Sequence, residues 1–170
     1  MTIGTHHRSS VLRAVRAVED RGTLPWDVEL AATYDTPDQL LLALHEHWSR
    51  QLLSRIDVAL ELGAGAPEES VAVAWRSALR GQPGLHRLLD AEADNPVLRP
   101  ARRTLLATVA VAAGRATFDD PPSVSVAEGA RLLASLAATT REASRPSPLA
   151  RLVRRLWDGG PVPDPYPWAA

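Results

Sequence analysis

The sequence predicts an all-α fold, a bundle of seven or eight helices around one long central helix. Apolar residues recur every three to four positions in most segments, which is the spacing of an amphipathic helix. The composition is rich in alanine and leucine and contains a single phenylalanine, so it favours helices over strands. Proline and glycine separate the segments at positions that start and end helices. With 170 residues, the chain is long enough to bury a substantial core.

The first predicted helix runs from about Ser9 to Arg21, and Gly22 supplies a stop signal after it. Its apolar stripe contains Val11, Leu12, Val15 and Val18. The segment that follows, Thr23 to Thr33, indicates one short helix over Pro25–Ala32. We expect Trp26 to anchor this short helix to the rest of the protein.

The longest predicted helix begins after Thr36 and continues to Gly63. Thr36 is suited to the N-cap, Pro37 to the first helical position, and Gln39 completes a capping box with Thr36. The apolar positions that follow keep a 3.6-residue period: Leu40, Leu41, Leu44, Trp48, Leu52, Ile56, Ala59 and Leu60. At 1.5 Å per residue this helix is about 40 Å long, and we expect it to form the spine of the fold.

The remaining helices follow from further start signals. They are predicted at Glu68–Arg80, from Pro83 onward, at Pro100–Arg115, at Ser125–Arg141 and at Leu149–Trp157. Ser125 and Glu128 have the spacing of a second capping box. The face of that helix predicted to point inward contains Ala130, Leu133, Leu136 and Ala137. A proline-rich tail ends the chain.

Composition and charge narrow the function. The net charge is −1, so no overall basic field directs the protein to nucleic acid. The chain has no cysteine, which excludes disulfides, thiolate catalysis and zinc–thiolate sites. No secretory signal and no apolar segment of about 20 residues is visible. We therefore expect a cytoplasmic protein that does not enter a membrane.

Three segments resemble TetR-family transcriptional regulators. Ser9–Arg21 with Gly22 is similar to their first helix, and Tyr34–Trp48 to the end of their recognition helix and the start of their long central helix. Ser70–Asp90 is similar to the helix pair that follows. The resemblance implies a homodimer with an apolar small-molecule effector. It implies a reduced helix-turn-helix-like region at 1–36, a ligand-binding and dimerisation core at 37–142, and a linker, short amphipathic helix and proline-rich tail at 143–170.

The DNA-reading part departs from the family's pattern. A helix-turn-helix needs close to 20 residues, whereas Thr23–Thr33 supplies eleven. The remaining helix, Pro25–Ala32, carries Asp27 and Glu29 but no basic residue, and acidic side chains repel DNA phosphates. Two hypotheses follow. The protein is either a TetR-like regulator with weakened or altered DNA binding, or a helical ligand-binding or dimerisation module that has lost the helix-turn-helix.

The first hypothesis points to four candidate DNA-binding residues. They are Arg8, Arg13 and Arg16 of the first helix, together with Tyr34. Arginine suits phosphate contacts through its fixed charge and its planar group of donors. Tyr34 is included because, in the resemblance, it closes the recognition helix.

Three residues are candidates for a ligand pocket: Trp48, Trp75 and His86. The resemblance places them on the helices that surround the effector pocket. Large aromatic walls with one polar group suit an apolar ligand. The alternative is that these residues belong to an ordinary packed core.

Catalytic and metal-binding patterns are not found. His45 and His47 lie two positions apart on a helix, about 200° around it, so they cannot grip one ion. We interpret them as polar residues on a solvated helix surface. There is no Gly-x-Ser-x-Gly motif, phosphate-binding loop or dinucleotide motif. We therefore expect a protein that is not an enzyme and has no cofactor and no metal.

Overall fold

The computed structural model describes residues 3–63 and 65–143, and this part of the chain is all-helical, as predicted. The chain divides into two units, Met1–Leu136 and Ala137–Ala170. In the described residues the α-helices and the 3₁₀ helix η1 are α1 (Ile3–Arg21), α2 (Val28–Ala31), α3 (Pro37–Glu61), α4 (Pro67–Gly81), α5 (Pro83–Ala91), η1 (Pro96–Leu98), α6 (Arg99–Ala112) and α7 (Pro122–Ala143). The predicted helix at Leu149–Trp157 and the proline-rich tail lie outside the described residues.

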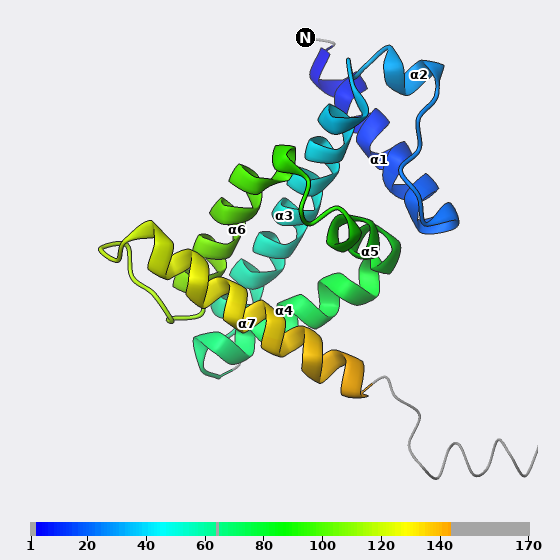
Figure 1. Cartoon of the computed structure of the whole chain (residues 1–170). Helices are drawn as coiled ribbons and strands as arrows, with labels where there is room; N and C mark the ends of the chain where they lie inside the picture. Colours follow the sequence, from blue (N-terminus) through cyan, green and yellow to red (C-terminus); the bar gives the residue numbers. More distant parts are fainter. Residues whose placement is uncertain (1–2, 64, 144–170) are drawn as a thin grey trace, which may run out of the picture. The chain divides into compact units, whose positions relative to one another are not determined.

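The central helix of the first unit is α3, which packs against α1, α4, α5, α6 and η1 (Figure 1). Thr36 is its N-cap: the side-chain oxygen accepts a hydrogen bond from the Gln39 N–H at 3.3 Å, as predicted. The return bond of the capping box differs, because the Gln39 Oε1 accepts from the N–H of Asp35 at 3.1 Å rather than from that of Thr36. The prediction of a long helix at the centre of the bundle is therefore confirmed.

The N-terminal segment differs from the prediction in two respects. Helix α1 begins at Ile3, six residues before Ser9, and ends at Arg21 as predicted, before Gly22 with its φ of 73°. Helix α2 has only four residues. It starts late because Asp27 is its N-cap and accepts a hydrogen bond from the Leu30 N–H at 2.8 Å.

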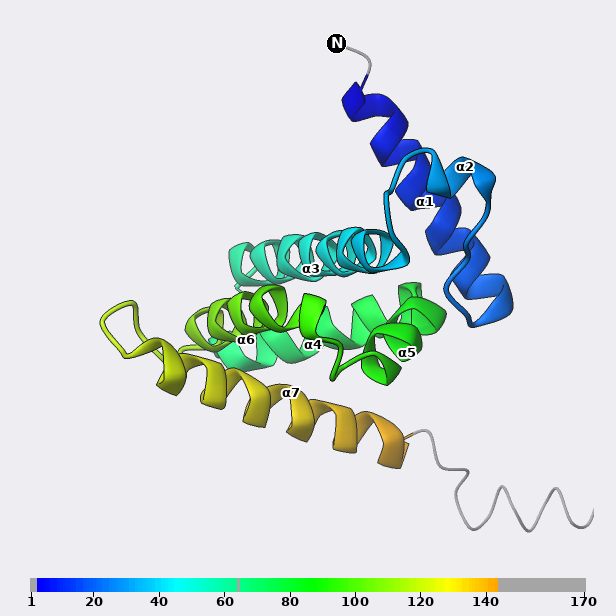
Figure 2. The ribbon, with the colours of Figure 1, turned by 45° about the horizontal axis from the view of Figure 1, so that its top comes forward.

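The anchor predicted for the short helix is wrong. Trp26 is 41% exposed and lies in the connection between α1 and α2. Figure 2 shows this connection as a loop. Leu30 and Tyr34 are buried instead and join the core cluster. Leu30 is buried in place of Trp26 because α2 starts after the cap at Asp27. Trp26 precedes that cap, whereas Leu30 lies within the helical turn.

Helix α5 receives its N-terminal cap from α1. The carboxylate of Glu19 accepts hydrogen bonds from the backbone N–H groups of Gly84 and Leu85, both at 2.8 Å. The residue before the helix, Gln82, makes no side-chain cap. A carboxylate at the positive end of the helix dipole is favourable, so Glu19 links two helices more than sixty residues apart in the sequence.

The bounds of α6 and α7 differ from those predicted. Helix α6 ends at Ala112 rather than Arg115, because Gly114 adopts a φ of 71°. Helix α7 begins at Pro122, three residues before Ser125, so Ser125 is a buried residue of the first turns and not a cap. The capping box predicted there is wrong.

The inward face of α7 also differs from the prediction. Gly129 and Leu132 are buried, whereas Ala130 is exposed. A Cβ atom at Gly129 would lie 2.0 Å from the carbonyl oxygen of Leu106. The backbones of α6 and α7 therefore touch at this glycine, which orients the face of α7 at this crossing. Among the described residues, no helix is long and apolar enough to span a membrane.

Candidate functional site

The three residues predicted for a ligand pocket come together in the first unit. Trp48 of α3 and Trp75 of α4 meet edge to face with ring centroids 6.2 Å apart. The ring of His86, from α5, lies 5.3 Å from Trp48 and 5.2 Å from Trp75. Each ring therefore contacts the other two, in the tilted and edge-on geometries that aromatic pairs prefer.

Helix periodicity and a short connection produce this cluster. Trp48 continues the buried row of α3 that includes Leu44 and Leu52. Trp75 lies on the buried face of α4, which packs along α3. Only Gln82 separates α4 from α5, so the chain turns at once and brings His86 back to the two tryptophans.

A cavity of about 70 Å³ lies beside the three rings. Its other lining residues are His45, Leu89, Asp90, Arg102, Leu105, Leu106 and Leu133. This volume holds a few water molecules and is smaller than the several hundred Å³ of a typical ligand pocket. Its lining residues make the cavity a mostly apolar space with aromatic walls and a small number of polar groups.

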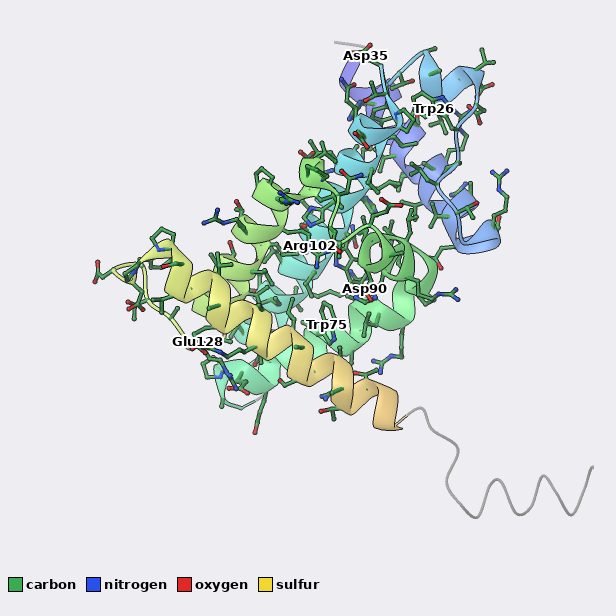
Figure 3. The ribbon with its side chains drawn as sticks, in the orientation of Figure 1. Trp26, Asp35, Trp75, Asp90, Arg102 and Glu128 are labelled. Carbon is green, nitrogen blue, oxygen red and sulfur yellow. The ribbon has the colours of Figure 1, made fainter. Side chains whose placement is uncertain are left out.

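One polar atom at the cavity has no hydrogen-bond partner in the described part of the chain. The indole Nε1–H of Trp75 is buried, and no acceptor lies within reach. The Arg102 guanidinium donates to the carbonyl oxygen of Leu89 at 3.3 Å. Trp75, Asp90 and Arg102 are labelled in Figure 3. Since a buried donor without an acceptor costs about 1–3 kcal/mol, the Trp75 N–H is a natural position for an acceptor group of a ligand.

His45 closes one side of the cavity. It is 4% exposed, which corrects its interpretation as a solvated surface residue. Burial, together with the positive charge of Arg102, lowers the pKa of His45 to about 4. The imidazole is therefore neutral at pH 7, and the Ser49 hydroxyl contacts its Nδ1 at 3.4 Å.

A groove of about 340 Å³ between α3 and α6 adjoins the cavity. Both spaces are lined by His45 and Leu105, so they adjoin at these two side chains. The other residues of the groove are Glu46, Ser49, Arg50, Leu53, Ala101, Thr104 and Thr108. Movement of His45 or Leu105 would join the small cavity to a space of ordinary ligand-pocket size.

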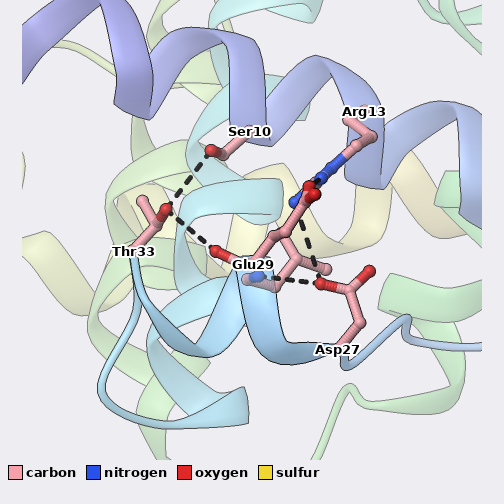
Figure 4. Close-up of polar contacts among 6 residues, drawn as sticks. Ser10, Arg13, Asp27, Glu29 and Thr33 are labelled. Atoms are coloured by element: carbon pink, nitrogen blue, oxygen red, sulfur yellow. Dashed lines mark hydrogen bonds and ion pairs between the residues drawn. The ribbon is translucent and has the colours of Figure 1, made fainter.

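Of the four candidate DNA-binding residues, Arg13 is engaged within the protein. Its guanidinium pairs with Glu29 and lies 3.8 Å from the Asp27 carboxylate (Figure 4). Beside this pair, the hydroxyls of Ser10 and Thr33 lie 3.4 Å apart. The acidic residues of α2 therefore neutralise a basic residue of α1.

The other three candidates have different environments. Tyr34 is 2% exposed, and its ring lies 4.9 Å from that of His7. Burial and, to a smaller degree, the charge of Glu46 raise the pKa of Tyr34, so its hydroxyl stays protonated at neutral pH. Arg8 and Arg16 lie on α1 with exposed side chains. DNA contact by any of the four stays a prediction.

Sequence reasoning missed His45, Leu105 and Arg102 as members of the site. A signal for His45 was present, because Leu41, His45, Trp48 and Leu52 form one continuous row on a helix. No comparable signal marks Arg102, which only the folded chain brings to the aromatic cluster.

Comparisons with protein-family models, with curated proteins and with solved structures found no match to this chain. Among the described residues, no group of three or more histidine, cysteine, aspartate or glutamate side chains is placed to hold a metal ion.

Proposed function

We propose that the protein is a helical module that binds a small, mostly apolar ligand in the aromatic cavity and does not read DNA through a helix-turn-helix. The observation that carries this proposal is the convergence of Trp48, Trp75 and His86 on a cavity with a buried, unpartnered indole N–H. The proposal keeps the TetR-like resemblance for the ligand-binding half. It assigns no reaction, cofactor or metal.

The lining defines the chemistry of the ligand. The rings favour a flat or compact apolar body, and the Trp75 N–H favours one acceptor such as a carbonyl oxygen. A ligand larger than a few heavy atoms exceeds the 70 Å³ cavity. Such a ligand displaces His45 or Leu105 and extends into the adjoining groove.

The N-terminal helices support the loss of DNA reading. Helix α2 is a single turn of four residues, whereas a recognition helix needs about two turns in the major groove. The carboxylates of Asp27 and Glu29 neutralise Arg13. The segment therefore lacks both the length and the free positive charge of a recognition helix.

A thermal-shift screen with small aromatic amides and ketones tests the proposal, because a ligand of the folded state raises Tm. We expect a compound that raises Tm of the wild-type protein and of Trp26→Phe equally. Trp26→Phe is the matched control, since it makes the same substitution at an exposed site. The same compound should lose most of its effect on Trp75→Phe. A shift that Trp75→Phe leaves intact, or no shift from any compound, contradicts the proposal.

The second candidate is a homodimeric TetR-like transcriptional regulator with weakened DNA binding. It is favoured by Arg8 and Arg16, which are exposed and form no ion pair with other described residues. Fluorescence anisotropy with duplex DNA from upstream of its own gene, at low and moderate salt, separates the two candidates. Tight, sequence-selective binding that survives added salt supports the regulator, whereas weak binding abolished by salt supports the ligand-binding module.

A further inference from the structure

A second hollow, of about 450 Å³, lies between α1 and α3. It is lined by His7, Arg8, Val11, Leu12, His47, Arg50 and Gln51. None of these residues lines the aromatic cavity. His45 and His47 are two positions apart on α3 and therefore face different sides of it, one side toward each space. The two spaces are separate sites.

The lining of this hollow is basic. Two arginines and two histidines contribute to it, together with the amide of Gln51, and no carboxylate of the described residues does. Neither Arg8 nor Arg50 forms an ion pair with another described residue. Arg50 uses its Nε to donate to the Glu46 carbonyl oxygen at 3.3 Å, and its terminal N–H groups form no hydrogen bond with another described residue. Uncompensated guanidinium groups in a recess favour an anion.

The imidazole of His47 adds a neutral polar wall. Burial first, and then the charges of Arg50 and Arg55, lower the pKa of His47. Its Nε2 lies 3.1 Å from the side-chain amide of Gln82, which fixes the ring between α3 and the start of α5. His47 therefore adds no positive charge to the hollow at neutral pH, whereas Arg8 and Arg50 do.

The hollow also has an apolar side. Leu12 is 43% exposed although it lies on the stripe of α1 that includes buried Val11. A ligand that covers Leu12 removes this apolar surface from water, which favours binding. The volume of 450 Å³ falls in the range of small-molecule pockets.

We propose that the α1–α3 hollow binds an amphipathic organic anion, with its charged head between Arg8 and Arg50 and its apolar body against Leu12. The planar guanidinium groups match the oxygens of a carboxylate through paired N–H donors. The hollow shares no lining residue with the aromatic cavity, although Arg50 also lines the groove that adjoins that cavity.

Isothermal titration of the full chain with sodium octanoate tests this site. We expect saturable binding that weakens at least tenfold in Arg8→Gln and in Arg50→Gln, because each loses charge-assisted hydrogen bonds. Arg16→Gln, an exposed arginine of the same helix that does not line the hollow, should bind as the wild type does. Trp75→Phe should also bind normally, which separates this result from the fate of the aromatic cavity.

Two reference ligands define the chemistry, and five results overturn the proposal. We expect 1-octanol and inorganic phosphate each to bind at least tenfold more weakly than octanoate, since one lacks the charge and the other the apolar body. If octanol binds as tightly as octanoate does, the arginines have no role in binding. Phosphate binding as tight as octanoate, or displacement of octanoate by duplex DNA, shows a contact for phosphate groups rather than an amphipathic site. Octanoate binding that both arginine variants leave unchanged, or no binding, removes the site.

Discussion

At the scale of single residues, His45 makes the stability of the protein depend on pH. Its pKa is about 4 in the folded protein and 6.5 in an unfolded chain. Below pH 6.5 the unfolded chain therefore binds a proton that the folded protein does not. The contribution of neutral His45 to the free energy of unfolding is complete above pH 6.5 and is lost as pH falls toward 4. The total loss is about 3 kcal/mol.

Urea unfolding at pH 7.5 and pH 5.0 measures this loss. We expect the wild-type free energy of unfolding to fall by about 2 kcal/mol between these conditions through His45, with His47 acting in the same direction. His45→Gln removes the titrating group, so its free energy should fall less over the same interval. Equal pH dependence in the two proteins would show that His45 is not held neutral in the fold.

Sequence reasoning identified the aromatic residues of the site better than its polar ones. Trp48 and Trp75 lie on clear apolar rows of their helices, and the resemblance to TetR regulators places both of them and His86 around a pocket. The sequence predicts that His45 lies on a solvated helix surface together with Glu46 and His47. Its row on α3 indicates burial, but only the packing of α6 with Arg102 and Leu105 explains where it points.

At the scale of elements, Glu19 controls how α1 is joined to α5. Glu19→Gln keeps the length of the side chain but places an amide N–H₂ against one of the two backbone donors of Gly84 and Leu85. We expect the substitution to lower the free energy of unfolding by about 1–3 kcal/mol. The adjacent Asp20→Asn, at an exposed position, should change it by less than about 0.5 kcal/mol. Equal effects would mean that the long-range cap contributes nothing.

The crossing of α6 and α7 makes Gly129 a second sensitive position. In Gly129→Ala the new Cβ meets the backbone of Leu106, which cannot move aside as a side chain does. We expect a loss of about 1–3 kcal/mol from overpacking, although alanine is the better helix former. Gly81→Ala is the matched control, because its Cβ meets only the end of the Arg55 side chain at 3.4 Å. Similar unfolding midpoints for both variants would contradict a close backbone contact.

Element prediction succeeded where start and stop signals are local. Thr36, Pro37 and Gly22 act through their own backbone neighbours, and α1 and α3 end or begin where these residues predict. The capping-box signal at Ser125 did not predict the helix start, because α7 already begins at Pro122 and Ser125 is buried within its first turns. Local signals also failed at Trp26, where the cap at Asp27 competes with Pro25 for the first turn. Competing caps within a few residues cannot be ranked without the tertiary contacts.

At the scale of the whole molecule, α1 belongs to the same hydrophobic core as α3, α5 and α6. Val18 of α1 and Val109 of α6 are both fully buried in one cluster. The resemblance to TetR regulators instead predicts a boundary between residues 1–36 and 37–142. A shared core makes the two regions unfold together, because exposing the apolar face of α1 also exposes the helices on which it packs.

Native-state hydrogen exchange decides whether this coupling holds. Val18→Ala should cost about 2 kcal/mol. If α1 and α6 unfold together, the free energy of exchange falls by this amount for the slowest amides of both helices. Leu12→Ala, a truncation at a partly exposed site of α1, should change the amides of α6 far less. A loss of protection in Val18→Ala confined to α1 would show that the N-terminal region unfolds by itself. The boundary near residue 36 would then separate two domains, as in a regulator with its own DNA-reading unit.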